Sequence, residues 1–316
     1  MRRTLGFRCL FGTQPIDATP GGRCQDAELA SGMPTDGWSH TREEWFEGAG
    51  GVRLFCRHAT PLSAPRAVLV ALHGLGDHSG LYPMLPDAFL PLGIEIFAPD
   101  LRGNGRSPGQ RAYVERWSEF REDLRRLVIR VRAERPTIPL FLLGNSMGGL
   151  VVLDYALHHP EGVRGVIAVS TPLGDLGVPR PLMALGRVLS RWWPRFSLNT
   201  GMDLSGLDRD PAVVDWVVHD PLFHRKGTAR LSTEVTATIE RVQAGAGGFP
   251  VPMLVLHGAA DRMVPPDGSR RFFGATGQPD RTLIEYPAAY HALLADVGGD
   301  QVLRDIAEWM TRRATM

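Results

Sequence analysis

A serine flanked by glycines is the feature of this sequence that most directly suggests chemistry. Residues Gly144-Asn145-Ser146-Met147-Gly148 fit the pattern Gly-x-Ser-x-Gly, and an apolar run precedes them. Apolar residues then follow at helical spacing, at Leu150, Leu153 and Leu157. This order of strand, tight turn and helix is typical of a serine nucleophile at the tip of a strained turn. Glycines are needed on both sides because a Cβ there would strike the neighbouring strand or helix. We interpret Ser146 as a nucleophile; the alternative is an ordinary glycine-rich turn.

A serine hydroxyl is a weak nucleophile, so this interpretation requires a base and a carboxylate that orients the base. On a sheet of this kind the acid and then the histidine follow the serine along the chain. Asp261 comes shortly after the apolar run Met253 to Leu256, and His291 comes shortly after the run Leu283 to Tyr286. We therefore predict Asp261 as the acid and His291 as the base.

Two nearby residues offer alternatives for these roles. Asp296 lies five residues after His291, but a carboxylate so close along the chain would have difficulty reaching Nδ1 of that ring. His257 ends a predicted strand, and we interpret it as a packed, hydrogen-bonded histidine and not as the base.

The transition state of ester hydrolysis carries negative charge on the former carbonyl oxygen, which backbone N–H groups can stabilise. Met147 follows the nucleophile and is the first predicted donor. The glycine-rich segment His73 to Gly80 follows an early apolar run, and we assign the second donor to Leu75. A phosphate-binding loop is disfavoured because no Gly-Lys-Ser/Thr follows, and a plain glycine-rich turn is the remaining alternative.

The elements that must position these residues form a regular series. Short apolar runs alternate with longer helical patterns, as expected for parallel strands that are buried on both faces and covered by helices. The predicted strands are Val52 to Cys56, Ala67 to Leu72, Ile94 to Ala98, Leu140 to Leu143, Val166 to Ser170, Met253 to Leu256 and Leu283 to Tyr286. The sequence therefore predicts an α/β fold with a mostly parallel central sheet.

The series is interrupted between residues 171 and 230, where helical fragments replace buried strands. We predict a core from residues 46–170 and 231–316, a helical cap at 171–230, and a flexible N-terminal extension at 1–45. Residues 13–40 of this extension are rich in Gly, Pro, Asp, Thr and Ser. The cap mixes apolar residues with arginines, which suits either a lid with solvated arginines or a lid that lies on a lipid surface. Its candidate acyl-chain contacts are Leu182, Met183, Leu185, Trp192 and Trp193; packing of the lid onto the core is the alternative.

Composition excludes several classes of protein. The 35 basic and 34 acidic residues give a net charge of +1, so there is no basic surplus for binding nucleic acid, and 43% hydrophobic residues favour a folded chain. The 3 cysteines indicate neither a disulfide framework nor a zinc site. No uninterrupted apolar stretch is long enough to span a membrane, and Arg8 interrupts a signal-like beginning. We expect a cytoplasmic protein, with no metal or organic cofactor.

Several segments together resemble the α/β-hydrolases of the monoacylglycerol lipase and lysophospholipase group, also described as the serine aminopeptidase S33 type. The matching segments are His73 to Gly80, Asp100 to Ser107, Gly109 to Val114, Gly144 to Gly149, Asp210-Pro211, Asp220 to Leu222, Asp261 and Tyr290-His291. The sequence departs from that group at Asn104 and Asn145, where histidine is common, and at Leu81, where monoacylglycerol lipases often have arginine.

The resemblance implies an α/β-hydrolase fold and a serine hydrolase that cleaves monoacylglycerols or related lipid monoesters through an acyl-enzyme on Ser146. It implies Asp261 and His291 as the other catalytic residues, and Leu75 and Met147 as the oxyanion hole. Lysophospholipase or general carboxylesterase activity remains an alternative, and acyltransferase, peptidase and non-catalytic receptor are more distant ones. The expected partner is a small lipid ester, with weak peripheral membrane contact through the cap; the sequence does not indicate an oligomeric state.

Overall fold

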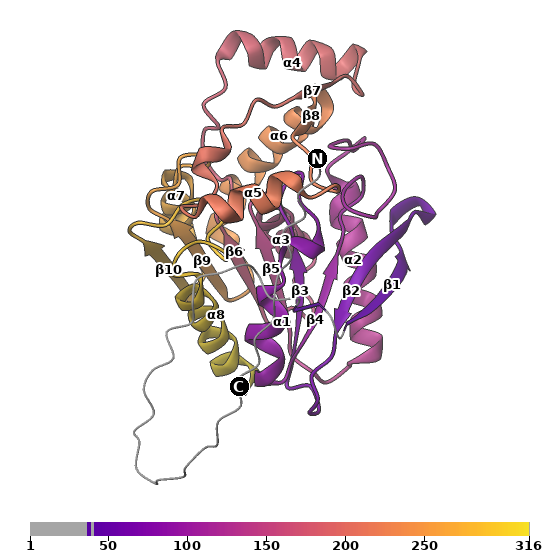
Figure 1. The fold of residues 1–316 in the computed structure, drawn as a ribbon, viewed down its shortest axis with the longest axis vertical. Helices are drawn as coiled ribbons and strands as arrows, with labels where there is room; N and C mark the ends of the chain where they lie inside the picture. The colour runs from indigo at the N-terminus through magenta and orange to yellow at the C-terminus, as the bar shows by residue number, and fades with distance from the viewer. Residues whose placement is uncertain (1–36, 39–40, 316) are drawn as a thin grey trace, which may run out of the picture. The chain divides into compact units, whose positions relative to one another are not determined.

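An eight-stranded sheet forms the central layer of the computed structural model, which describes residues 37–38 and 41–315 (Figure 1). Its strands are β1 (Arg42–Glu47), β2 (Arg53–Ala59), β3 (Ala67–Leu72), β4 (Ile94–Pro99), β5 (Leu140–Asn145), β6 (Gly165–Val169), β9 (Met253–Gly258) and β10 (Arg281–Tyr286). Their spatial order is β1-β2-β4-β3-β5-β6-β9-β10. Strands β1 and β2 pair antiparallel and β2 pairs antiparallel with β4, whereas all other pairs are parallel. The predicted mostly parallel sheet is therefore confirmed.

Each predicted apolar run overlaps a strand of this sheet, with Val52 and Ser170 one residue outside β2 and β6. One strand has no counterpart among the predicted runs. The strand that was not predicted is β1, whose residues 42–45 fall inside the range 1–45 that the sequence assigns to an extension. Four of the six residues of β1 are charged, and only Trp45 and Phe46 are apolar. Such a composition is typical of a charged edge strand and produces no apolar run. The rest of the predicted extension lies outside the described residues, apart from residues 37–38 and 41.

Apolar side chains fill both faces of the sheet. Along β3, Val68, Val70 and Leu72 point to one core cluster while Leu69 and Ala71 point to the other. This alternation is the period of two that a strand imposes, and it explains why a strand buried on both faces has a continuous apolar sequence.

The helices cover the two faces of the sheet. Buried residues of α2 (Ser118–Glu134), α3 (Met147–His158), α6 (Ala229–Gly245) and α7 (Asp267–Ala275) belong to the first cluster, and those of α1 (Met84–Phe89) and α8 (Gly299–Ala314) belong to the second. Short 3-10 helices are η1 (Ala49–Gly51), η2 (Ser79–Leu81), η3 (Leu90–Leu92), η4 (Leu204–Gly206) and η5 (Ala246–Gly248). The described chain is thus a layered α/β structure, as predicted.

A long insertion between β6 and β9 contains the cap. It comprises α4 (Arg180–Trp192), α5 (Pro211–His219) and a two-stranded antiparallel ribbon of β7 (Ser197–Asn199) and β8 (Lys226–Thr228). Helix α6 follows at once and packs against both α4 and α3. Figure 1 shows α4 as the outermost helix, with α5 and α6 between it and the sheet. The predicted cap range 171–230 thus contains α4, α5 and the ribbon, and the chain enters α6 at its end.

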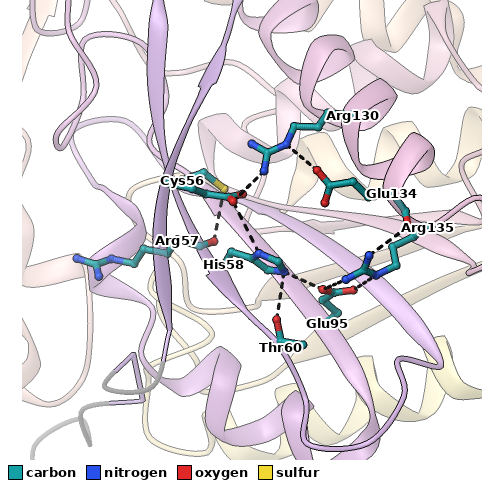
Figure 2. A network of polar contacts seen from close by, with 9 residues as sticks. Cys56, Arg57, His58, Thr60, Glu95, Arg130, Glu134 and Arg135 are labelled. Carbon is teal, nitrogen blue, oxygen red and sulfur yellow. Dashed lines mark hydrogen bonds and ion pairs between the residues drawn. The ribbon is translucent and has the colours of Figure 1, made fainter.

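A buried polar network attaches α2 to the antiparallel edge of the sheet (Figure 2). His58 Nε2 lies 2.7 Å from Glu95 Oε1, and Arg135 donates two hydrogen bonds of 2.8 Å to the same carboxylate. Burial alone would raise the pKa of Glu95, but the hydrogen bonds from His58 and Arg135 outweigh it and lower the pKa. A carboxylate that is fully buried is therefore kept ionised by its partners, and these fix α2 against β2 and β4.

Candidate active site

Ser146 occupies the sharp turn between β5 and α3. Its φ of 51° and ψ of −120° are unusual for a residue with a side chain. The turn brings backbones so close that a Cβ on Gly144 would lie 2.2 Å from the carbonyl oxygen of Gly148. Glycine at position 144 is therefore a steric requirement of the turn that presents Ser146, which is the arrangement that the sequence pattern predicts.

The structure brings the three predicted catalytic side chains together. His291 Nε2 lies 3.1 Å from Ser146 Oγ, and His291 Nδ1 lies 2.7 Å from Asp261 Oδ2. Asp261 lies in the loop after β9 and His291 in the loop after β10, at the same edge of the sheet as the turn after β5. The chain of contacts from carboxylate to imidazole to hydroxyl is the geometry with which a histidine can take a proton from a serine.

The environment of Asp261 keeps its carboxyl group ionised. Burial alone would raise its pKa, but hydrogen bonds from His257, His291 and the backbone N–H of Val264 hold the pKa well below its ordinary value. Oδ1 accepts two backbone N–H groups, those of Met263 and Val264, at 2.9 Å each. A carboxylate that is ionised in this way can stabilise the imidazolium that forms when His291 takes a proton.

The two alternative residues have other contacts. Asp296 accepts hydrogen bonds from the Arg209 guanidinium at 2.9 Å and from the Tyr290 backbone N–H at 2.7 Å, while Asp261 is the carboxylate at His291 Nδ1. His257 is fully buried, with Nε2 2.9 Å from the Val264 carbonyl oxygen and Nδ1 2.9 Å from Ser269 Oγ. Because the carbonyl can only accept, Nε2 carries a hydrogen and donates it to Val264. His257 is thus a packed, hydrogen-bonded histidine, as interpreted from the sequence.

The predicted oxyanion donors lie on two segments that flank Ser146. Met147 is the first residue of α3, where backbone N–H groups have no acceptor within the helix. Leu75 lies in the loop after β3, and both residues line the same cavity as Ser146 and His291. Such N–H groups suit an oxygen that gains negative charge.

His73 fixes the peptide group that carries the Leu75 N–H. Its Nε2 accepts the backbone N–H of Leu101 at 2.9 Å, so the ring hydrogen is on Nδ1 and is donated to the Gly74 carbonyl oxygen at 2.8 Å. Burial lowers the pKa of His73, so the ring stays neutral. In a trans peptide C=O and N–H point to opposite sides, which leaves the Leu75 N–H facing away from His73. Only the position of His73 directly before Gly74 and Leu75 hints at this role in the sequence, and the glycine-rich pattern alone does not predict it.

A largely apolar cavity of about 530 Å³ opens over Ser146. Its volume lies within the range of small-molecule sites. The cap supplies much of the lining, through Leu176, Val178, Met202, Leu204, Leu207, Val213, Trp216, Val217 and Phe223. Helix α6 adds Leu231 and Val235. Polar side chains gather near the nucleophile, at Asp77, Tyr82 and Asn145.

None of the five predicted acyl-chain contacts is among the residues that line this cavity. Leu182, Met183, Leu185, Trp192 and Trp193 belong to α4 or follow it directly. The helix lies against α6, where Ser190 Oγ contacts Thr233 Oγ1 at 2.8 Å, and its other side faces outward, so that Trp192 is 78% exposed. The helical pattern identifies an apolar stripe but not the element that covers it. Here the cavity is roofed by α5, α6 and the loop before α5 instead.

Two features are absent from the described part of the chain. Within residues 37–38 and 41–315, no three His, Cys, Asp or Glu side chains are grouped as a metal site. In the same residues, no helix combines the length and the apolar character needed to cross a bilayer.

Comparison with known proteins agrees with this geometry. Residues 63–298 match the family model described as serine aminopeptidase, S33. The chain is 34% identical to a monoacylglycerol lipase from Mycolicibacterium smegmatis over 276 residues, which cover 86% of this chain and 98% of the relative. It is 32% identical to the human monoglyceride lipase over 272 residues, covering 84% and 89% of the two chains. The crystal structure of a Paleococcus ferrophilus monoacylglycerol lipase is 34% identical with a TM-score of 0.75, and the alignment covers 82% of this chain and 99% of that one.

Proposed function

Because the chain belongs to the serine aminopeptidase S33 family of α/β-hydrolases, we propose that it hydrolyses monoacylglycerols or closely related lipid monoesters. The observation that carries this proposal is the placement of Ser146 Oγ, 3.1 Å from His291 Nε2, at the base of a largely apolar cavity. The related proteins described above, which are named as monoacylglycerol or monoglyceride lipases, support the same substrate class.

The proposed reaction has two steps on Ser146. In the first, His291 Nε2 takes the hydroxyl proton while Ser146 Oγ forms a bond to the ester carbonyl carbon, and the carbonyl oxygen becomes an oxyanion held by the N–H groups of Leu75 and Met147. The oxyanion then collapses, the ester C–O bond breaks, and His291 gives its proton to the leaving alcohol. Asp261 holds the imidazole in the required orientation and stabilises its cationic form.

The second step frees the acid. A water molecule in the position of the departed alcohol gives a proton to His291 Nε2 and attacks the acyl carbon. The second oxyanion rests on the same two N–H groups, and the bond to Ser146 Oγ breaks as His291 returns the proton to it. The products are a fatty acid and the unaltered enzyme.

The cavity favours an ester with one acyl chain. Its walls are largely apolar side chains of the cap, which would bury such a chain. Asp77, Tyr82 and Asn145 supply polar groups near Ser146, where the alcohol of the ester would lie. Position 81 contributes a buried leucine to this region and no positive charge. For this reason a lysophospholipid or a simple carboxylic ester is the second candidate substrate.

A matched substrate panel tests the proposal. We would measure hydrolysis of monoacylglycerols of short to long chain, a lysophospholipid and an aryl ester, with Ser146→Ala as the blank. We expect monoacylglycerols to be cleaved with the highest kcat/KM. Cleavage of the short aryl ester alone would leave a general carboxylesterase, and no Ser146-dependent turnover of any ester would contradict the proposal.

We also propose that the protein is cytoplasmic and contacts lipid surfaces reversibly through α4. The outward side of this helix presents Leu182, Leu185, Val188 and Trp192, which are 52 to 78% exposed. Arg187 and Arg191 are exposed on the same helix. Exposed apolar residues beside arginines suit a helix that lies at an anionic membrane interface.

A further inference from the structure

The phenol of Tyr82 connects the two segments that carry the proposed oxyanion donors. Gly74, the residue before Leu75, directs its backbone N–H at the Tyr82 hydroxyl across 3.4 Å. Asn145, the residue before the nucleophile, donates from Nδ2 to the same oxygen at 2.9 Å. The Tyr82 hydroxyl in turn donates to Asp77 Oδ2 at 2.7 Å.

We infer that Tyr82 is a positioning residue of the oxyanion hole, which holds the Leu75 segment at a fixed distance from the nucleophile segment through these three hydrogen bonds. This inference rests on the proposed function, because it assigns a role relative to the reaction at Ser146. It adds a residue that the donors need but that touches neither of them.

The direction of each hydrogen bond is determined by chemistry. An ionised carboxylate can only accept, so the one hydrogen of the Tyr82 hydroxyl goes to Asp77. The lone pairs of the phenol oxygen are then left to face Asn145 Nδ2 and the Gly74 N–H, which can only donate. Burial, together with Asp77, raises the pKa of Tyr82 well above its ordinary value, so the hydroxyl stays protonated.

The Gly74 backbone needs such a restraint. Glycine has wide freedom in φ and ψ, and here both of its polar groups are held: the N–H by Tyr82 and the carbonyl oxygen by His73. Gly74 also lies directly against the nucleophile, since a Cβ on it would be 3.2 Å from Ser146 Cβ. A rotation about Gly74 would therefore move the Leu75 N–H relative to a substrate carbonyl bound at Ser146. Misplacement of a catalytic group by about 1 Å can lower the rate of reaction about 100-fold.

Tyr82→Phe tests the inference, because it removes the hydroxyl and keeps the ring. We expect kcat for aryl esters to fall about tenfold, since a whole oxyanion donor contributes about 10²–10³-fold and here a donor is loosened but not lost. KM should change little. The loss should be the same for esters with different leaving alcohols, and the affinity for a trifluoromethyl ketone, which mimics the tetrahedral intermediate, should fall by a similar factor.

Tyr286→Phe is the matched control. Its hydroxyl donates to Asp305 at 2.6 Å, so the substitution removes a phenol–carboxylate hydrogen bond of similar length from a residue that does not line the cavity. We expect its kcat and inhibitor affinity to equal those of the unaltered protein.

Asp77→Ala provides a second variant should Tyr82→Phe fold poorly, since Asp77 is partly exposed. It removes the acceptor that orients the hydroxyl and should lower kcat in the same way, and the double variant should be no slower than Tyr82→Phe alone, as expected for coupled residues. Wild-type kcat in Tyr82→Phe, or a raised KM with kcat unchanged, would overturn the inference while leaving the proposed function intact. Failure of the unaltered protein to cleave any ester would overturn both.

Discussion

Asp208 is a buried carboxyl group whose replacement should make the protein more stable at neutral pH. It belongs to the cap segment next to the His291 loop and is 4% exposed. Burial raises the pKa of Asp208, and a hydrogen bond from the Asp210 N–H opposes this in part. The nearby carboxylates of Asp296 and Asp210 raise the pKa further, so that it moves from 3.8 to about 6. The folded protein therefore binds this proton more tightly than the unfolded chain does.

The sign and size of the effect follow from proton linkage. Between pH 4 and 6 the folded state holds a proton that the unfolded state has lost, so the stability contributed by this group falls as pH rises through that window. Above pH 6 the carboxyl group is ionised in both states and the full cost remains. At about 1.4 kcal/mol for each pKa unit, that cost reaches about 3 kcal/mol. Because the Asp208 carboxyl group also interacts with the neighbouring Asp296, we expect the cost to be about 1 to 3 kcal/mol.

Asp208→Asn removes the ionisation and keeps the shape. The new side chain can accept from the Asp210 N–H, as Asp208 Oδ1 does at 2.8 Å, and its amide can donate to Asp296. The free energy of unfolding is measured at pH 4 and at pH 8 by urea unfolding followed by circular dichroism. We expect the free energy of unfolding of the variant, relative to that of the unaltered protein, to be about 1 to 3 kcal/mol higher at pH 8 than at pH 4.

Asp203→Asn is the control, because it makes the same charge change on an exposed residue of the cap. A hydrogen bond from the Ser205 N–H lowers the pKa of Asp203, so this variant should become relatively less stable, not more, as pH rises. A stability difference between Asp208→Asn and the unaltered protein that is the same at pH 4 and pH 8 would refute the reasoning.

Three further predictions concern activity and lipid binding. Ser146→Ala, His291→Ala and Asp261→Asn should each lower kcat by about 10⁴-fold or more without loss of folded structure; a soluble Asp261→Asn with full ester turnover would shift the acid role to Asp296. Val213→Trp fills part of the cavity from α5. This variant should lower kcat/KM for long-chain monoacylglycerols at least tenfold more than for a short aryl ester. An equal loss for both substrates would argue against an acyl chain in this region. The double variant Leu185→Ser, Trp192→Ser should cosediment less with anionic liposomes than the unaltered protein does. The control Ile129→Ser alters an exposed apolar residue of α2 and should not change cosedimentation. Unchanged cosedimentation of the double variant would exclude α4 as the contact.

The sequence predicts the sheet and the three catalytic candidates because their signals are local. Each of Ser146, Asp261 and His291 follows a predicted strand, and the carboxyl ends of neighbouring parallel strands meet at one edge of the sheet. No comparable rule joins Tyr82 to Asn145, which are 63 positions apart, or Glu95 to Arg135, which are 40 apart. Such pairs depend on how loops fold over the sheet, and each residue alone resembles an ordinary polar residue of a loop or helix end.

The cap shows a different limit of sequence reasoning. A helix with apolar and basic sides must place its apolar side somewhere, but the sequence does not say whether a cavity, a neighbouring helix or solvent receives it. On α4 the residues that face α6 are small or half-buried, and the largest apolar side chains face outward. The side chains that do line the cavity come from α5, α6 and connecting loops. On α5 and α6 they also recur at helical spacing, so spacing alone does not distinguish them from the stripe on α4.

The cap is also bonded to the loops that carry the proposed chemistry. The backbone N–H groups of His291 and Ala292 donate to carbonyl oxygens in the cap, those of Gly206 and Leu207, at 3.4 and 2.7 Å. On the opposite side of the site, the His224 N–H donates to the Gly76 carbonyl oxygen at 3.0 Å, one residue beyond Leu75. Cap residues thus hold both the base loop and the oxyanion loop. The cap therefore contributes to the geometry of the reaction as well as to binding of the chain, and changes in it can alter turnover even of esters too short to reach its apolar wall.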